Sequence, residues 1–148
     1  MGTQSSQTDV STADLYRELI ASFNGREFER GAELIAEDAE QVDYATGKVE
    51  IGPAGRVRVF ESSIDGFSDA RTEITRIISD GQTCLYEAIY RGTHDGPLTI
   101  GNGDTSSVLP ATGRVVEIPF AGIVIGNGTK IIYAAKYYDS ATYEKQLA

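Results

Sequence analysis

The sequence predicts an α+β fold in which a curved antiparallel sheet is covered on one face by about three N-terminal helices. In the first third of the chain the apolar residues recur at helical spacing, and from Ala70 onward they follow the period of strands. Helices first and antiparallel strands afterwards are typical of α+β domains rather than of alternating βαβ units. The 148 residues, of which 41% are apolar, suit one domain with a core of its own.

Two helices are predicted at the start of this domain. Ser11 to Asp14 have the spacing of a capping box, in which the side chain of the first residue binds a free backbone N–H of the first turn. The buried stripe that follows consists of Leu15, Leu19, Ile20 and Phe23, and Asn24-Gly25 ends the helix. A second helix carries Phe28, Ala32 and Ile35 on one face.

A short strand over Gln41 to Tyr44 and a turn at Thr46 to Lys48 precede the third predicted helix. This helix starts at Gly52-Pro53, because proline is tolerated in a first turn whose N–H groups have no helical partner. Its buried stripe is formed by Val57, Phe60 and Ile64, and it ends near Gly66.

Two hairpins follow. Strands over Thr72 to Ser79 and Gln82 to Thr93 flank Asp80-Gly81, which is typical of a type I′ turn. The other pair of strands, Arg114 to Ile125 and Thr129 to Tyr138, flanks Gly126-Asn127-Gly128. A short helix is expected from Ser140 onward.

The segment from Asp95 to Gly113 shows little periodicity and is rich in Gly, Thr and Ser. Loops of this length are uncommon in compact domains unless they serve as lids or binding loops. Two interpretations stay open: a lid or subunit contact, or a passive insertion.

The charge and the apolar content of the chain limit which kinds of partner are expected. A net charge of −9 repels phosphate backbones and anionic membranes, so no nucleic-acid or membrane partner is expected. No apolar run is long enough to span a bilayer.

The single cysteine, Cys84, lies in an apolar strand and suits a reducing compartment, so we expect a cytoplasmic protein. We expect residues 1–11 to be a disordered polar tail and residues 12–148 to be the domain.

Three motifs, in this order, resemble the SnoaL-like polyketide cyclases of the nuclear-transport-factor-like superfamily. They are Gly92-Thr-His-Asp-Gly-Pro-Leu98, Leu109-Pro-Ala-Thr-Gly-Arg114, and a last strand that ends in Tyr137-Tyr138-Asp139. The resemblance runs from about Asp14 to Gln146 and implies a cone-shaped half-barrel that encloses an apolar pocket. It also implies a homodimer, because a second subunit commonly covers the exposed sheet in such folds.

The same resemblance implies site residues, and the sequence departs from the expected pattern at two of them. Cyclases of this family carry an acid–base aspartate three residues before the final aspartate of the last strand, and Lys136 stands at that place. The N-terminal half resembles ketosteroid isomerases: counted from Asn24, Asp43 falls where those enzymes keep their general base. Their oxyanion tyrosine is replaced by Leu19.

Each candidate residue has a functional and a structural interpretation. Asp43 is a pocket base or a turn residue, and His94, the only histidine, is a proton carrier at the pocket mouth or a brace for the loop. Lys136 polarises a carbonyl or forms a Schiff base, or else it is a surface lysine or the partner of a carboxylate. Asp139 binds ligand or caps the last helix.

Several aromatic residues could line the pocket, although aromatic side chains are also the usual content of a core. These residues are Tyr16, Phe23, Phe60, Tyr86 and Tyr138. No metal site is expected, because one histidine without clustered ligands cannot hold zinc. No nucleotide or flavin cofactor is expected either, because no phosphate-cradling glycine loop follows a strand.

The leading functional prediction is a cofactor-independent cyclase or isomerase. It would transfer protons beside the carbonyl of a polyketide-like or other cyclic compound, with Asp43 or His94 as base and Lys136 stabilising the enolate. The alternative is a non-catalytic domain that binds a small hydrophobic molecule or mediates dimerisation, since Lys136 replaces the family's catalytic aspartate.

Overall fold

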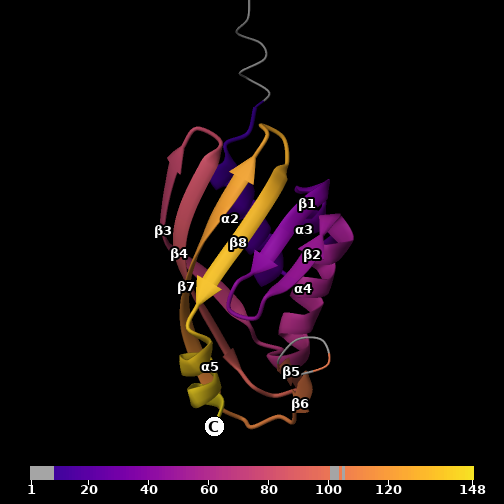
Figure 1. Cartoon of the computed structure of the whole chain (residues 1–148), viewed down its shortest axis with the longest axis vertical. Helices are drawn as coiled ribbons and strands as arrows, with labels where there is room; N and C mark the ends of the chain where they lie inside the picture. Colours follow the sequence, from indigo (N-terminus) through magenta and orange to yellow (C-terminus); the bar gives the residue numbers. More distant parts are fainter. Residues whose placement is uncertain (1–8, 101–103, 105) are drawn as a thin grey trace, which may run out of the picture.

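The structure is a computed structural model that describes residues 9–100, 104 and 106–148. Its helices are α2 (Thr12–Asn24), α3 (Phe28–Ala32), α4 (Gly52–Gly66) and α5 (Ser140–Leu147). The first three lie against one face of a sheet, and α5 lies at the end of the molecule below β8 (Figure 1). The side chain of Ser11 accepts a hydrogen bond from the backbone N–H of Asp14 and begins α2, as the capping pattern predicts.

The strands of the main sheet are β1 (Ile35–Asp43), β2 (Lys48–Ile51), β3 (Arg71–Asp80), β4 (Thr83–Thr93), β7 (Val115–Gly126) and β8 (Ile131–Tyr138). Within the described residues they form one curved sheet in the order β2-β1-β8-β7-β4-β3 (Figure 1). The predicted α+β fold with N-terminal helices is thus confirmed. The sheet is mixed rather than antiparallel throughout, because β1 and β8 run parallel. Because β1 and β8 are far apart in the chain, no hairpin turn connects them. Local turn signals therefore cannot reveal whether the two strands run parallel or antiparallel.

Two other local predictions were wrong. Ile35 was placed in the second helix, but α3 ends at Ala32 and Ile35 opens β1, where it pairs with Ile131 of β8. The loop after His94 contains the strands β5 (Leu98–Ile100) and β6 (Ser107–Leu109), which pair with each other. Ile35 was misassigned because a single apolar residue fits the helical period and the strand period equally well. The strands β5 and β6 were missed because three residues are too few to show alternation.

Both predicted hairpins are present. Asp80 pairs with Thr83, so the central turn residues are Gly81 and Gln82. Within the described residues only Gly81 of this pair has a positive φ, +62°, which fits a type II′ turn rather than the expected type I′. In the second hairpin the side chain of Asn127 accepts hydrogen bonds from the backbone N–H groups of Thr129 and Lys130.

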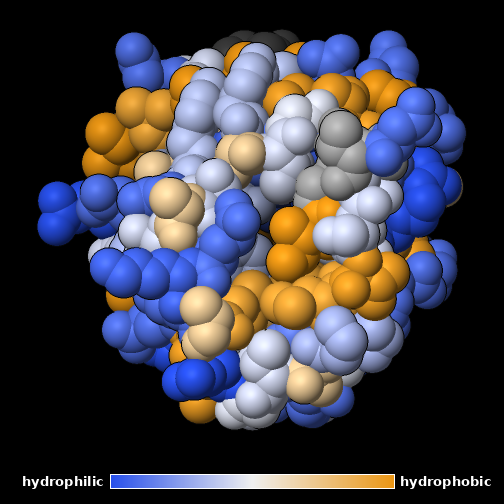
Figure 2. All heavy atoms as spheres, turned by 60° about the horizontal axis from the view of Figure 1, so that its bottom comes forward, coloured by the Kyte–Doolittle hydropathy of each residue, from blue (hydrophilic) through white to orange (hydrophobic). Residues whose placement is uncertain are grey.

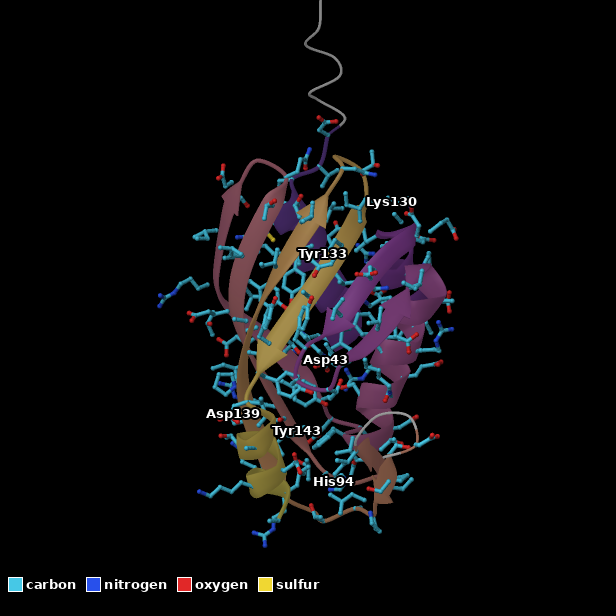
Figure 3. All side chains as sticks on the ribbon, in the orientation of Figure 1. Asp43, His94, Lys130, Tyr133, Asp139 and Tyr143 are labelled. Atoms are coloured by element: carbon cyan, nitrogen blue, oxygen red, sulfur yellow. The ribbon has the colours of Figure 1, made fainter. Side chains whose placement is uncertain are left out.

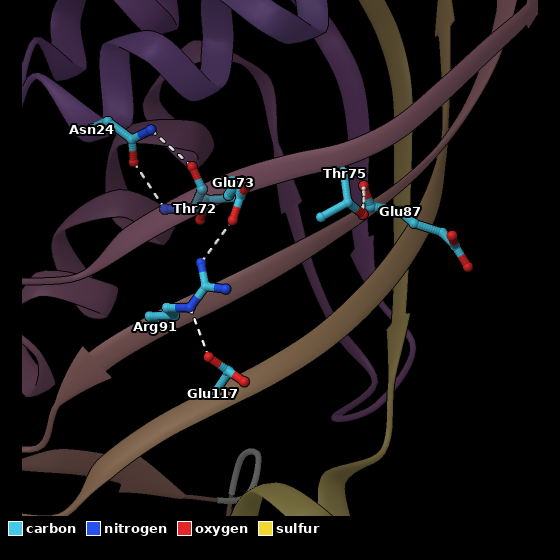
Figure 4. Close-up of polar contacts among 7 residues, drawn as sticks. All are labelled: Asn24, Thr72, Glu73, Thr75, Glu87, Arg91 and Glu117. Atoms are coloured by element: carbon cyan, nitrogen blue, oxygen red, sulfur yellow. Dashed lines mark hydrogen bonds and ion pairs between the residues drawn. The ribbon is translucent and has the colours of Figure 1, made fainter.

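The core lies between the helices and the concave face of the sheet. Along β4, Cys84, Tyr86 and Ala88 are buried while Leu85 and Glu87 are exposed, as expected for a strand with one covered face. Helix α2 is attached to β3 by Asn24, whose amide group donates to Thr72 O (2.8 Å) and accepts from Thr72 N (2.9 Å) (Figure 4).

On the opposite, solvent-facing side, ion pairs link neighbouring strands. Arg91 of β4 contacts Glu73 of β3 and Glu117 of β7, both at 2.8 Å (Figure 4).

The predicted tail over residues 1–11 falls mostly on residues 1–8, which lie outside the described part of the chain. Of the residues that follow, Val10 donates its backbone N–H to Gly128 O at 2.7 Å.

Candidate functional site

A row of paired residues crosses the concave face of the sheet. Asp43 of β1 pairs with Lys136 of β8, Lys136 with Gly122 of β7, and Gly122 with Tyr86 of β4. Residues directly opposite each other on neighbouring strands project to the same side. This side is the helix-covered one, because the Tyr86 ring stacks on Tyr16 of α2 with centroids 4.2 Å apart.

Gly122 makes room in this row for the tyrosine ring. A Cβ atom at position 122 would lie 2.5 Å from Tyr86 Oη and 2.7 Å from its Cε2, and would also collide with the carbonyl oxygen of Ala135. Glycine in the middle of a strand often marks such a close approach. Because of it, the phenol of Tyr86 lies across β7 towards Lys136.

Asp43 has one oxygen in the local turn and the other in the site. Its Oδ1 accepts hydrogen bonds from the backbone N–H groups of Ala45 (3.0 Å) and Thr46 (3.3 Å). Its Oδ2 accepts a hydrogen bond from Tyr138 Oη at 3.1 Å and lies 3.8 Å from Lys136 Nζ. The two interpretations of Asp43 are therefore compatible: the turn fixes the carboxylate, and the free side of Oδ2 faces an ammonium and a phenol.

Solvent reaches this group. The side chain of Lys136 is 38% exposed and that of Asp43 is 20% exposed, although both lie on the concave face. Desolvation by the surrounding protein lowers the pKa of Lys136, while the charge of Asp43 raises it and that of Arg56 lowers it again. Solvent access moderates these effects. Lys136 is therefore both the partner of a carboxylate and an inward-facing amine.

Tyrosines surround the row with neutral phenols. Burial raises the pKa of Tyr86 and of Tyr90, each to about 12, and it also raises the pKa of Tyr138 and Tyr143 well above the usual value. Groups that stay protonated near neutral pH are hydrogen-bond donors that do not ionise. A carbonyl oxygen entering the site would therefore meet donors rather than phenolates.

Arg56 was not predicted from the sequence. This residue lies on α4, and its Nε donates to Gln41 Oε1 at 2.6 Å, two residues before Asp43 on the same face of β1. The signal was present, since Arg56 precedes Phe60 by one helical turn and therefore shares the apolar stripe of α4. Gly122 was missed as well, although an isolated glycine inside a strand pattern was visible.

His94 lies away from this group. It is fully buried and located at the end of the molecule near β5 and β6, whereas Asp43 lies near the middle (Figure 3). Its Nδ1 accepts a hydrogen bond from Thr112 N at 3.2 Å and is 2.9 Å from Thr112 Oγ1. Nε2 has no partner among the described residues. These contacts tie the start of the long loop to its end, as the bracing interpretation of His94 expects. The imidazole binds the backbone N–H and the hydroxyl of Thr112 rather than a backbone carbonyl group.

Other sequence-predicted residues have structural contacts. Asp139 caps α5, accepting from Thr142 N (3.1 Å) and Thr142 Oγ1 (2.7 Å), and these hydrogen bonds lower the pKa of Asp139. Phe23 and Phe60 are buried with ring centroids 5.0 Å apart between α2 and α4. Tyr138 is partly buried and contacts Asp43 directly.

Two hollows of the described surface lie elsewhere. One, of about 190 Å³, is lined by residues that include Asp69, Arg91 and Val115, and another, of about 500 Å³, lies between α2 and β3. Figure 2 shows hydrophobic residues gathered around a depression at the end of the molecule that carries α5, β5 and β6. Partly exposed apolar side chains of this region include Ile64, Ile100 and Leu109.

Within residues 9–100, 104 and 106–148, no cluster of three or more His, Cys, Asp or Glu side chains has the arrangement to hold a metal ion. Over the same residues, no helix combines the length and apolar character required to cross a bilayer.

The family model of the SnoaL-like polyketide cyclases matches residues 13–147, which is nearly the whole chain. The chain belongs to this family. The motifs around His94, Leu109 and Asp139 therefore identified it correctly. No curated protein matches the sequence.

Solved structures agree on the fold of this SnoaL-like chain. One described as a SnoaL-like polyketide cyclase from Jannaschia sp. CCS1 has a TM-score of 0.79 at 13% identity, over 94% of this chain and 92% of that chain. IdmH from Streptomyces antibioticus, assigned as a polyketide cyclase, has a TM-score of 0.75 at 23% identity, over 93% and 99%. A protein from Catenulispora acidiphila with a ketosteroid isomerase-like fold, in complex with trimethylamine, has a TM-score of 0.72 at 19% identity, over 89% and 90%.

Proposed function

We propose that this SnoaL-like protein is a cofactor-independent enzyme that transfers a proton beside the carbonyl group of a polyketide-like or other cyclic compound, as a cyclase or isomerase does. The observation that carries this proposal is the contact of Asp43 Oδ2 with Tyr138 Oη (3.1 Å) and Lys136 Nζ (3.8 Å) on the concave face. Enolate chemistry needs a base that removes the proton and, close to it, hydrogen-bond donors that stabilise the negative charge on the oxygen.

In this mechanism Asp43 removes the proton from the carbon next to the carbonyl. The electron pair of the broken C–H bond forms a carbon–carbon double bond, and the π electrons of the carbonyl group move onto its oxygen. The ammonium of Lys136 stabilises the negative charge there, and so does the phenol of Tyr138 once Asp43 Oδ2 has taken the proton and no longer needs its hydrogen bond. Protonation of the enolate at another carbon, or its attack on a second carbonyl, completes isomerisation or ring closure. Protonated Asp43 gives its proton to that carbon in the isomerisation, or to the alkoxide formed in the ring closure, and both transfers regenerate its carboxylate.

The geometry favours Asp43 over His94 as the base. Nδ1 of His94 is engaged by Thr112, and the ring is fully buried at the end of the molecule. Asp43, in contrast, is partly exposed and borders the amine. The depression seen in Figure 2 would be the entry for the ligand, beside the loop that His94 braces.

The test is deuterium exchange into 1-tetralone, a cyclic ketone, followed by NMR in D₂O. The wild-type protein is expected to accelerate exchange at the carbon beside the carbonyl, and Asp43→Asn is expected to reduce the rate by about 10²–10⁴-fold, the usual contribution of a general base. Asp38→Asn on the exposed face of the same strand is a matched control with the same charge change. Exchange that survives in Asp43→Asn would refute the role of this base.

The second candidate function is a non-catalytic domain that binds a small hydrophobic molecule. The observation that favours it is Lys136 at the position of the family's catalytic aspartate, since an ammonium cannot accept the proton at neutral pH. A ligand that raises the melting temperature without any acceleration of exchange would support this alternative.

We further propose that the protein is a cytoplasmic homodimer formed through the outer face of the sheet. One row of apolar residues crosses this face from strand to strand, and it consists of Val49, Val42, Ala135, Ile123, Leu85 and Ile78. Ile78 is 61% exposed, Val49 48% and Leu85 44%. Ala135 in the middle of the row is only 3% exposed, so the apolar surface is formed by the larger side chains on either side of it. A twofold contact would cover these side chains in both subunits.

A further inference from the structure

Arg56 has an unusual place for a charged residue. It lies on the stripe of α4 that faces the core, and its guanidinium carbon is 5.3 Å from the centre of the Phe60 ring. Its Nε donates to Gln41 Oε1 at 2.6 Å. Gln41 is itself 5% exposed and is fixed by a 3.0 Å hydrogen bond from its Nε2 to Gly52 O. The orientation of the guanidinium is therefore set by a buried amide.

The charge of Arg56 has no carboxylate partner among the described residues. The neighbouring arginine of the same helix behaves differently, because Arg58 forms an ion pair with Glu50 at 2.9 Å. Burial lowers the pKa of Arg56, and the nearby phenols of Tyr16 and Tyr86 raise it. The side of the guanidinium formed by Nη1 and Nη2 makes no hydrogen bond to the described residues, because its only such bond uses Nε.

The interior of the site is consequently cationic. Arg56 and Lys136 supply two positive charges against the single carboxylate of Asp43, an excess of one, in a chain with a net charge of −9. Arg56 is partly exposed, so solvent and a ligand can reach its guanidinium. The hydrogen bond to Gln41 uses Nε alone, so among the described residues the two Nη groups are left to bind water or a ligand.

We propose that Arg56 is the anchor for a carboxylate on the ligand, which would dock on the Nη1 and Nη2 groups next to Lys136. The guanidinium fork matches the two oxygens of a carboxylate, and a fork held rigidly loses little freedom on binding. This inference rests on the proposed function and specifies its substrate class: a cyclic carbonyl compound that also carries an acid group. The carboxylate would bring the excess charge to zero and leave Asp43 free to act on the ketone half.

The test compares 6-carboxy-1-tetralone with its methyl ester, which lacks the charge and carries one extra methyl group, by isothermal titration calorimetry. Wild-type protein is expected to bind the acid about tenfold to a hundredfold more tightly than the ester, the range of one charge-assisted hydrogen-bond pair. Arg56→Met should abolish this preference, because it should weaken the binding of the acid far more than that of the ester. Arg58→Met, which removes an exposed arginine from the same helix, should keep the preference.

A second variant keeps the test decisive if Arg56→Met does not fold. Arg56→Lys retains the charge but loses the fork, so it should bind the acid with an intermediate affinity. Equal affinity of the wild type for acid and ester, or equal loss in the Arg56 and Arg58 variants, would overturn the proposal. Exchange of 1-tetralone tests the proposed function separately: exchange without acid preference removes only the anchor, and acid preference without exchange removes only the catalysis.

Discussion

Gly122→Ala tests the close packing of Gly122 against Tyr86 in the row that crosses the concave face. The added methyl carbon would lie 2.5 Å from Tyr86 Oη and would collide with the carbonyl oxygen of Ala135 on the neighbouring strand. Relief of both contacts requires a local shift of β7 against β8 and a swing of the tyrosine ring away from Tyr16. Overpacking of this kind costs about 1–3 kcal/mol, and loss of the aromatic stack adds about 0.5–1.5 kcal/mol.

The expected destabilisation of about 2–4 kcal/mol corresponds to a fall in melting temperature of roughly 5–15 °C for a chain of this size. Thermal and urea unfolding, followed by circular dichroism, measure it. Gly25→Ala is a suitable control, because its φ is −85° and its nearest new contact is 3.3 Å, so it should change the unfolding free energy by less than about 1 kcal/mol.

A double-mutant cycle identifies the cause. In a Tyr86→Ala background the ring is gone, so Gly122→Ala should cost less than it does in the wild type. A melting temperature for Gly122→Ala within about 2 °C of the wild type, or strictly additive effects in the cycle, would refute the packing described here. The same substitution should also slow exchange of 1-tetralone, because it displaces a phenol beside Lys136.

Three further predictions concern other parts of the molecule. Asn24→Ala removes both hydrogen bonds to the backbone of Thr72 and should lower the urea unfolding free energy by about 1–3 kcal/mol. Hydrogen bonds from Thr142 lower the pKa of Asp139 in the folded protein, so their stabilisation is present above the unfolded pKa of about 3.9 and is lost as the pH falls through the folded value. Asp139→Asn should therefore make stability less sensitive to pH below about 4, and an unchanged acid unfolding curve would contradict this. If the proposed dimer forms through the outer face, Leu85→Lys should give a monomer in analytical ultracentrifugation, and a monomeric wild type would contradict the proposed interface.

Local features of the fold were predictable from the sequence. The capping pattern at Ser11, the proline at position 53 and the glycines at positions 81 and 128 act within a few residues of themselves, so their effects could be predicted without knowing the rest of the chain. The parallel pairing of β1 with β8 could not, because it joins segments about ninety residues apart and leaves no local pattern. For the same reason Ile35 was assigned to a helix.

The candidate site also has features that could be predicted from the sequence and features that could not. Asp43 and Lys136 were identified one at a time, by their positions relative to motifs, and the sequence by itself determined the family, the strand on which each lies and the local turn that holds Asp43. Only the tertiary structure decided that these two side chains meet, that Gly122 admits Tyr86 beside them, and that Arg56 enters from the helical layer. The physical reason is that hydrogen bonds along the chain depend on neighbours in sequence, whereas the charge balance of an interior depends on which distant strands pair and in which register.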